Sequence, residues 1–567
     1  MSKRVSILLS LLLVVAVVAG CAPAATPTSV PPTAVPATAV PPTAVPPTAV
    51  PPTPVPEPKV FRKAAMEPDS LDPSKGGPGF QEFQNLYEPL VDSYSADGQI
   101  KPLAAEKFEI SPDGLVVTFT LRSGLKWSDG KDLTAEDFRF SWLRQLDPAT
   151  GSYVPDEFYA IKNGEQFNKG EITDPSQVGL VALDARTLVV TLKESAPYWL
   201  RYVGMTDYCP VRKDVLEKHG DKWMEAGNHV GNGPYMLKEW KHDQLLVFER
   251  NPFYNGPWKD TRHVDRIEFV LVQDPAALGL TKYEANEVDA AAIPATEYER
   301  VLNDPTMSKE ILSVPSAGQT VLIFDTKNKP TDDVRVRQAL NMAIDRETLA
   351  QKVLKGAYLT STSFSPSSLP SYNPSTFLTY DVAKAKDLLA QAGFPDGRGF
   401  PTIELTHWNV QRASLECQAI AAMWKENLGI NTSLVPLAPA AMRDYRISRA
   451  NQPFHVYYAW NVCGILDPIE FHNAQLDPAG NVRYSRYDNA EYVELIREGK
   501  KESDLGKRDA MFQQAEALVN RDCPIIPVTE DVTLLVVKPY LKNFAEITTA
   551  LVAFHRVAQP PGLDIVR

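Results

Sequence analysis

Apolar residues recur along residues 59–567 with two spacings, one typical of strands and one typical of helices. The alternation of Val117, Phe119 and Leu121 with polar neighbours indicates a strand with one buried face. Alternation and short apolar runs together predict strands within 59–73, 115–122, 178–193, 245–250, 267–272, 403–407, 430–435, 454–460, 525–528 and 533–537. The segment 178–193 turns at 184–186, so it is expected to supply two strands.

Helices are predicted where apolar positions lie three and four residues apart. This spacing predicts helices over 80–91, 134–143, 215–223, 282–289, 333–355, 381–392, 414–427, 491–498 and 507–520, with a small-residue strand after 282–289. Thr134 and Asp137 form a capping-box pattern, and Asp332 or Asp333 is expected to cap the helix that ends at Gly356. Since strands and helices interleave throughout, the predicted class is α/β.

The first twenty residues have the pattern of a secretory signal peptide. Lys3 and Arg4 precede an apolar stretch to Ala19, which is shorter than the roughly 20 residues that span a membrane. Ala19-Gly20 directly before Cys21 resembles the bacterial lipobox, which implies cleavage before Cys21 and lipidation of its thiol. The alternative is an ordinary signal peptide with a chance cysteine.

Residues 21–58 are expected to link that cysteine to the folded body. They repeat Pro-Pro-Thr-Ala-Val and close variants, a composition that cannot bury a core. Extended polyproline II at about 3.1 Å per residue would let this linker reach on the order of 100 Å. We therefore predict a disordered stalk, either a spacer of required length or a linker of any length.

Composition narrows the classes of function. The chain is 44% hydrophobic, and 70 acidic residues outnumber 58 basic ones, giving a formal net charge of −12. No basic tract stands out, which argues against nucleic acid as a partner. Beyond Cys21 the four cysteines are Cys209, Cys417, Cys463 and Cys523; they allow three complete pairings, and free thiols are equally possible. No Cys-x-x-Cys spacing is present, so no metal site and no cofactor are expected.

A series of short motifs in a fixed order carries a resemblance to a known family. They are Glu67–Pro73, Tyr87–Leu90, Leu103–Glu106, Phe119–Arg122, Trp127–Gly130, Thr134–Phe138, Asp147–Thr150, Pro197–Tyr198, Asn232–Tyr235, Glu249–Pro252, Asp333–Arg337, Asp467–Pro468 and Val537–Tyr540. With these motifs, Phe61 to Lys542 resembles bacterial extracellular solute-binding protein family 5, the oligopeptide- and dipeptide-binding lipoproteins of ABC importers.

The resemblance implies a two-lobed periplasmic-binding-protein fold with an extra domain on the first lobe. The expected order is signal peptide (1–20), lipidated Cys21 and linker (21–58), lobe 1 (59–90), extra domain (91–203), lobe 1 again (204–317), lobe 2 (318–530) and a return to lobe 1 (531–567). It also implies a monomer that holds a small solute, expected to be a peptide, between the lobes and delivers it to permease subunits. The lipid would keep the protein extracytoplasmic, on the membrane surface.

Several cleft residues follow from the same resemblance. Glu67, Pro68 and Asp69 are expected at a strand edge that hydrogen-bonds a peptide backbone, or else to be a plain edge strand. Asn232 and Gly233 lie in a glycine-bearing loop that lets backbone approach a ligand, or else forms a structural turn.

Further cleft candidates lie elsewhere along the chain. Tyr153 is one. Trp408 and Asn409 are two others. Alternatively, Trp408 packs in the hydrophobic core and does not face the cleft.

A third group of candidates follows the strand at 454–460. It comprises Tyr458, Trp460, Asn461, Gly464 and Asp467. Here the chain departs from the family, in which an Asp at the position of Gly464 pairs with the peptide ammonium and an Arg at the position of Tyr458 meets the peptide carboxylate.

An unpaired buried charge costs several kcal/mol, so capture of a peptide by both termini is in doubt. Asp467, Glu530 or Asp531 are the alternative carboxylates, unless they are structural or solvated acids.

No catalytic motif is present. The eight histidines are dispersed, and there is no His-Glu-x-x-His, Gly-x-Ser-x-Gly or Walker sequence, so a non-enzyme is expected. Two kinds of function remain. The first is solute capture for import, of a peptide or of an oligosaccharide, opine or metal chelate. The second is a surface signalling or adhesion role on the same fold.

Overall fold

The structure is a computed structural model. It describes residues 57–76, 85–93, 99–257, 259–260, 264–361, 363–369, 372, 379–438, 441–442, 445, 453–475, 485–544 and 563–566. The predicted signal peptide, Cys21 and nearly all of the predicted linker lie outside these residues. The body, Glu57–Arg567, is described by itself.

One large mixed sheet runs through the body. Its strand order is β15-β14-β16-β12-β17-β11-β1-β10-β9-β8, with β13 also paired to β17. The strands are β1 (Val60–Ala65), β8 (Tyr235–Lys241), β9 (Leu245–Arg250), β10 (Arg266–Leu271), β11 (Ala290–Ala292), β12 (Ile311–Phe324), β13 (Leu359–Thr360), β14 (Ile403–Trp408), β15 (Thr432–Leu437), β16 (Val456–Val462) and β17 (Ile525–Val537).

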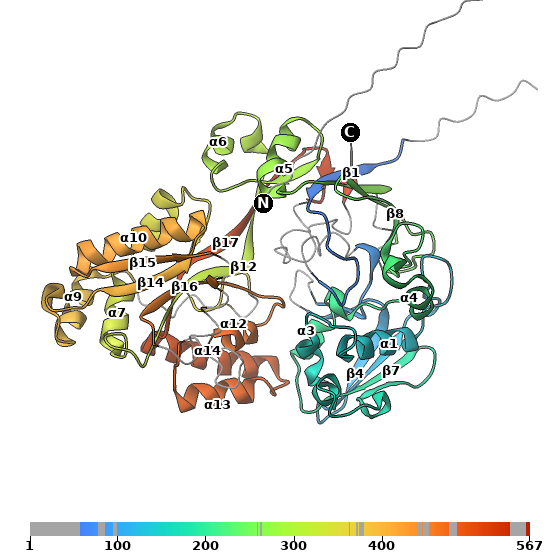
Figure 1. Ribbon diagram of the computed structural model, residues 1–567, viewed down its shortest axis with the longest axis horizontal. Coiled ribbons are helices and arrows are strands. Elements are labelled where there is room, and N and C mark those ends of the chain that lie inside the picture. Colours follow the sequence, from blue (N-terminus) through green and yellow to red (C-terminus); the bar gives the residue numbers. More distant parts are fainter. Residues whose placement is uncertain are drawn as a thin grey trace, which may run out of the picture. The chain divides into compact units, whose positions relative to one another are not determined.

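The two longest of these strands, β12 and β17, connect the two halves of the sheet (Figure 1). From Gly318 to Phe324, β12 also pairs with β16, whereas the far end of β17 pairs with β11. The register of β12 against β17 shifts between Pro315 and Gln319. A shift of this kind bends a strand locally. The predicted lobe boundaries at 318 and 530 fall beside this shift and remain a prediction.

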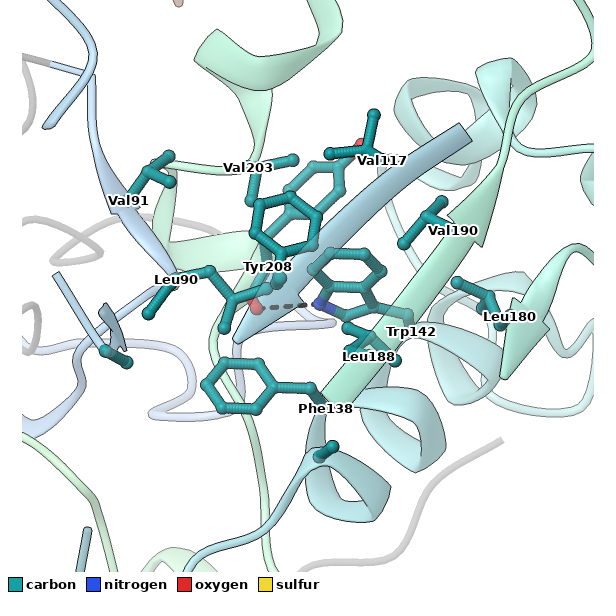
Figure 2. Close-up of a cluster of buried hydrophobic side chains, with 14 of the residues drawn as sticks. Leu90, Val91, Val117, Phe138, Trp142, Leu180, Leu188, Val190, Val203 and Tyr208 are labelled. Carbon is teal, nitrogen blue, oxygen red and sulfur yellow. Dashed lines mark hydrogen bonds between the residues drawn. The ribbon is translucent and has the colours of Figure 1, made fainter. Parts of the chain in front are cut away.

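A separate four-stranded sheet is formed by residues between 105 and 191. Its order is β4 (Ala105–Ile110), β5 (Val116–Leu121), β7 (Thr187–Thr191) and β6 (Leu180–Ala182). Trp142 and Phe138 of α1 (Ala135–Leu146) pack among the inward side chains of this sheet, as Figure 2 shows. The indole Nε1 of Trp142 donates to the carbonyl oxygen of Tyr208 at 2.8 Å. This bond ties the segment around residue 208 to the same core.

The remaining strands form short pairs, and helices flank the sheets. The pairs are β2 (Val91–Asp92) with β3 (Lys101–Pro102) and β18 (Leu541–Lys542) with β19 (Asp564–Ile565). The further α-helices are α2 (Gly164–Asn168), α3 (Trp199–Tyr202), α4 (Lys213–His219), α5 (Pro275–Glu284), α6 (Tyr298–Asn303), α7 (Val334–Met342), α8 (Arg346–Thr348), α9 (Val382–Gln391), α10 (Gln411–Leu428), α12 (Ile469–Gln475), α13 (Ala490–Gly499) and α14 (Leu505–Asp522).

Strand β16 has a hydrophobic cluster on each face. Tyr457 packs with α13 and α14 residues such as Tyr492 and Phe512, whereas Tyr458 packs with α7 and α10 residues such as Trp424. Neighbouring residues of a strand face opposite sides of the sheet, which explains the division. The α/β class predicted from the sequence is confirmed.

Four element predictions are wrong in the described residues. Of 80–91, Asn85 and Leu86 lie in a 3-10 turn, but the chain is not helical from Tyr87 onward, and Val91–Asp92 forms β2. Instead of a helix over 282–289, α5 begins at Pro275 and ends at Glu284, because Asp274 caps it and Asn286 has a φ of 58°.

The other two errors concern continuity. The helix predicted over 333–355 breaks after Met342, and Asp345 starts a new turn by accepting from the Thr348 N–H. The two strands predicted within 525–537 are one strand, β17.

The four cysteines of the body are buried free thiols. Within the described residues no helix is long and apolar enough to span a membrane. In the same residues no group of three or more His, Cys, Asp or Glu side chains has the arrangement of a metal site.

Candidate functional site

Glu67 lies just after β1 and not in a strand. Because β1 ends at Ala65 and is paired to β10 and β11, the prediction that Glu67–Asp69 form a strand edge is wrong. Glu67 accepts from Trp240 Nε1 at 3.0 Å and from the Asp243 N–H at 3.0 Å. Its carboxylate also bonds His242 at 2.7 Å and raises the pKa of that imidazole.

A cavity of about 730 Å³ opens beside Glu67. It is lined by Met66, Glu67, Asp243, Leu271, Val272, Gln273 and Leu278. Pro68 is buried and Asp69 is exposed. A role of these three residues in ligand contact stays a prediction.

Asn232 and Gly233 bind their own chain. The Asn232 amide accepts from the Glu88 N–H at 3.0 Å and donates to the Glu88 carbonyl at 2.8 Å. The Gly233 N–H donates to Leu86 at 2.9 Å, and a β-carbon at Gly233 would lie 2.4 Å from the Tyr87 nitrogen. We infer that this loop is the structural turn weighed above, since the close backbone approach is to residues 85–88.

Tyr458 and Trp460 of β16 lie beside a buried ionic group, which we call the Arg412 cluster: Arg412, Glu416, Thr529 and Asp531. Arg412 bonds Glu416 at 3.2 Å, Asp531 at 2.5 Å and Thr529 Oγ1 at 2.9 Å. Tyr458 is buried and hydrogen-bonds Glu416, and Trp460 donates its Nε1 to Asp531 at 2.5 Å.

The Arg412 cluster is closed on itself. Glu416 is fully buried and also accepts from Thr529 Oγ1 at 2.6 Å and Thr320 Oγ1 at 3.1 Å. The guanidinium lies 3.7 Å from the centre of the Tyr358 ring. Tyr458 stands where the family resemblance implies an arginine, and Arg412 places a cation close to that position. Two carboxylates already neutralise that cation.

The other candidates on these strands have structural surroundings as well. Glu530 of β17 accepts from the Ser367 hydroxyl at 2.5 Å and the Ser367 N–H at 3.1 Å, and burial raises its pKa. Trp408, at the end of β14, is half-buried against both clusters that flank β16. Asn409 is exposed, and its N–H donates to Leu437 at 2.7 Å. Asn461 is buried.

Asp467 is held by two arginines. Arg508 makes a bidentate pair with it at 2.7 and 2.8 Å, and Arg201 Nε lies 3.5 Å away. Arg508 is itself buried, so the pair is out of water. A carboxylate paired in this way is not available to a ligand ammonium, and we infer a structural role for Asp467.

Tyr153 and Gly464 each lie against a carboxylate that the sequence did not single out. The Tyr153 hydroxyl donates to Asp207, which is 1% exposed. The Gly464 N–H donates to Glu470 Oε2 at 3.3 Å. A β-carbon at Gly464 would lie 3.6 Å from that oxygen, so Glu470 places a carboxylate beside the position where the family resemblance implies an aspartate.

Tyr202 links helix α3 to helix α12 through a hydrogen bond. Its hydroxyl, at the end of α3, donates to Glu470 of α12, and the two helices lie side by side in Figure 1. Nearby, Ser195 Oγ donates to the Lys501 carbonyl at 3.0 Å and Lys501 pairs with Glu194 at 3.3 Å.

Glu157 completes the region. Its carbonyl accepts from the Tyr208 hydroxyl at 2.8 Å, and Phe158 stacks on the Tyr208 ring with centroids 4.0 Å apart. We call Glu157, Asp207 and Glu470 the acidic cluster. No periodicity or motif marks these three residues in the sequence, because they come from three segments far apart along the chain.

The fold defines a class first: two α/β halves joined by a pair of long strands, as in binding proteins that enclose a solute. Residues 99–482 match the family "Bacterial extracellular solute-binding proteins, family 5 Middle". The chain belongs to this family, as its motifs predicted, and its two-lobed periplasmic-binding-protein fold is confirmed.

Named relatives are similar over most of their length. The probable deoxycholate-binding periplasmic protein YgiS of Escherichia coli is 32% identical over 84% of this chain and 89% of its own. The periplasmic murein peptide-binding protein MppA of the same organism is 32% identical over 88% and 92%. The unliganded open form of the murein tripeptide-binding protein MppA superposes with a TM-score of 0.79 at 29% identity, over 90% of this chain and 98% of that one. These relatives are solute-binding proteins.

Proposed function

We propose that this protein captures a peptide or peptide-like solute between its two lobes and delivers it to the permease of an ABC importer. Membership of solute-binding family 5 over residues 99–482 is the observation that carries the proposal. Similarity to a murein peptide-binding protein over 88% of the chain supports the peptide class of ligand. The named relatives bind solutes, which favours a protein without catalytic turnover.

The proposed mechanism is closure around the ligand. A ligand that contacts both lobes stabilises the closed state by its differential affinity for that state. The register shift of β12 against β17 supplies the place where the two strands would bend. The lobe and domain boundaries predicted from the sequence belong to this proposal.

The proposed location is the outer face of the cell membrane. It rests on Ala19-Gly20-Cys21 and the proline-rich segment that follows. Mass spectrometry of the mature N-terminus tests it: diacylglycerol on Cys21 is expected, and Cys21→Ser is expected to release the protein from membranes. An unmodified N-terminus other than residue 21 would remove the anchor from the proposal.

Ligand-induced thermal stabilisation tests the binding function. A bound ligand stabilises the folded state by RT ln(1 + [L]/Kd), about 2.7 kcal/mol at one hundred times Kd. We expect peptides from a tripeptide-to-hexapeptide library to raise Tm. If no peptide does so, the peptide class is contradicted.

A non-peptide solute is the second candidate. The similarity to a probable deoxycholate-binding protein favours it, as does the buried Tyr458 in place of an arginine. Bile acids, oligosaccharides, opines and metal chelates form the second arm of the same assay. If no compound of either arm raises Tm, the signalling or adhesion role is favoured. A ligand-independent pull-down of a surface protein would then support that role.

A further inference from the structure

A short serine-rich loop lies across the two long strands beside their register shift. It comprises residues 363–369, which we call the serine strap, and it follows β13, whose Leu359 pairs with Glu530 of β17. Four of its seven residues are serines, so its side chains can donate hydrogen bonds to acceptors on both strands.

Strand β12 bulges where the serine strap contacts it. It pairs with β17 up to Pro315 and again from Gln319, whose partner is Glu530. Residues 316–318 lie between these pairs and match a single residue of β17, Asp531. A bulge interrupts the ladder and lets a strand bend, which makes residues 316–318 the place where the two lobes can tilt.

Two adjacent serines fasten the strap to both strands. Ser367 donates its hydroxyl to Glu530 Oε2 at 2.5 Å and its backbone N–H to the same oxygen at 3.1 Å. Ser368 donates its hydroxyl to the Ser316 carbonyl at 3.2 Å. Ser316 lies in the bulge and Glu530 lies in the ladder pair next to it. A tilt of β12 against β17 at the bulge would therefore change a separation that these two serines hold.

The strap is anchored in the half of the sheet that contains β16. Phe364 and Leu369 are buried in the hydrophobic cluster that includes residues of α13 and α14. Ser365 donates to the buried carboxylate of Glu516 in α14, and the Phe364 carbonyl accepts from the side-chain amide of Gln319. Because these contacts fix the strap to one lobe, a tilt must be taken up by the bonds of the two serines.

The bulge is closely packed on its other face. A β-carbon at Gly318 would lie 2.3 Å from Asp531 Oδ2, and Asp531 is bonded by Arg412 and Trp460, each at 2.5 Å. Neighbouring residues of a strand face opposite sides of the sheet, so Asp531 and Glu530 point away from each other. The Arg412 cluster and the serine strap thus hold the bulge from opposite faces.

We propose that the serine strap limits how far the two lobes tilt at the bulge and so sets the angle between them in the unliganded protein. The inference rests on the proposed function, in which closure at this place encloses the solute. The strap acts without contact to the solute. The net strength of one hydrogen bond changes an equilibrium constant by about two- to tenfold, which is the size of effect expected for each bond of the strap.

A double variant, Ser367→Ala with Ser368→Ala, tests the strap in the full chain. Ser367 is exposed and Ser368 is half-buried, so the fold is expected to be retained. Spin labels on the exposed positions Thr173→Cys, before β6, and Ala383→Cys, in α9, report the distance between the lobes. The four cysteines of the body are buried, and Cys21→Ser in every sample removes the remaining thiol.

Pulsed electron spin resonance measures the distribution of this distance without ligand. We expect the double alanine variant to have a broader distribution, with the population outside the wild-type range raised about two- to tenfold. A distribution equal to that of the wild type would overturn the proposal. A lower Tm with an unchanged distribution would do the same, because it would show that the strap only stabilises one lobe.

Two further variants isolate the role of the hydroxyl groups. Ser313→Ala removes an exposed serine of β12 outside the strap and should leave the distribution unchanged. Ser367→Thr keeps the hydroxyl and should also behave as the wild type; broadening equal to that of the double alanine variant would contradict the proposal. Since these measurements use no ligand, failure of the thermal-shift assay would contradict the proposed function alone, and the strap would be judged separately.

Discussion

The Arg412 cluster and the acidic cluster both bury carboxylates, but only the first has its own cation. Glu416 and Asp531 share Arg412, and two threonine hydroxyls supply further hydrogen bonds. Glu157, Asp207 and Glu470 have tyrosine hydroxyls and backbone groups around them. A tyrosine hydroxyl donates a hydrogen bond but carries no charge, so it leaves the net charge of the acidic cluster uncompensated.

This difference shows in the direction in which the pKa values of the two clusters move. Burial alone would lower the pKa of Arg412, but the carboxylates of Glu416 and Asp531 outweigh it and raise that pKa. In the acidic cluster burial raises each carboxyl pKa, and no arginine reverses the change. Removal of one partner from a paired buried group therefore destabilises the fold, whereas removal of a charge from the acidic cluster relieves a cost.

Arg412→Leu should have the largest effect on the stability of the protein. It leaves Glu416 and Asp531 buried without a cation, and removal of one partner of a buried pair costs about 3–5 kcal/mol. Equilibrium denaturation should show a loss of this size in the free energy of unfolding. Arg412→Lys, which keeps the charge but not the fork of donors, should lose less. Wild-type stability of Arg412→Leu would show that the cluster is not the ionic unit described above.

Asp207→Asn should stabilise the protein, whereas Arg412→Leu should destabilise it. Because the folded pKa of about 6 lies above the ordinary 3.8, the protonated carboxyl stabilises the fold at low pH, and that contribution is lost as pH rises through 6. At pH 7.5 the asparagine variant should therefore be more stable than the wild type by about 1–3 kcal/mol, at 1.36 kcal/mol per pKa unit. Near pH 4 the two should unfold alike. A difference that does not change with pH would contradict the assignment.

Tyr202→Phe should have a smaller effect. It removes the hydroxyl that donates to Glu470 and leaves that acceptor short of a partner, at a cost of about 1 kcal/mol. Thermal unfolding measures it, with Tyr380→Phe at an exposed position as the control. A loss several times larger would mean that Tyr202 supports more than the hydrogen bond to Glu470.

Lys501→Met should have the smallest effect. The pair between Lys501 and Glu194 is 3.3 Å long, with side chains 40% and 53% exposed. Exposed pairs contribute about 0–1 kcal/mol, so Tm should scarcely move at physiological salt. A clear destabilisation that disappears in high salt would contradict this prediction, because it would show that the ion pair stabilises the fold.

Elements with clear end signals were predictable from the sequence. Helix α1 follows the capping pattern of Thr134 and Asp137, which are joined by a 2.8 Å hydrogen bond from the Thr134 N–H. Helix α9 begins after Asp381, whose side chain accepts from Lys384. Both rest on local hydrogen bonds, which the sequence specifies directly.

Long strands were harder to predict. Strand β12 was not predicted, because Pro315 and Gly318 within it read as breakers. In the structure they flank the register shift, where proline and glycine are tolerated. The helix predicted over 333–355 failed for the converse reason: its apolar stripe continues, but the Asp345 side chain caps a new turn.

The site was only partly accessible to sequence reasoning. That Gly464 and Tyr458 mark departures from the family pattern stays a prediction. Glu470, Glu157 and Asp207 could not be grouped from the sequence, since they come from three segments far apart along the chain, and the contact of Glu470 with Tyr202 forms only in the fold. Whether Asp467 was paired could likewise be decided only in the structure, from the positions of Arg508 and Arg201.

A crystal structure of the protein with the solute that co-purifies with it tests the central claim most directly. We predict a ligand enclosed between the lobes, with contacts to residues of both. A ligand bound to one lobe alone, or on the outer surface, would contradict the account.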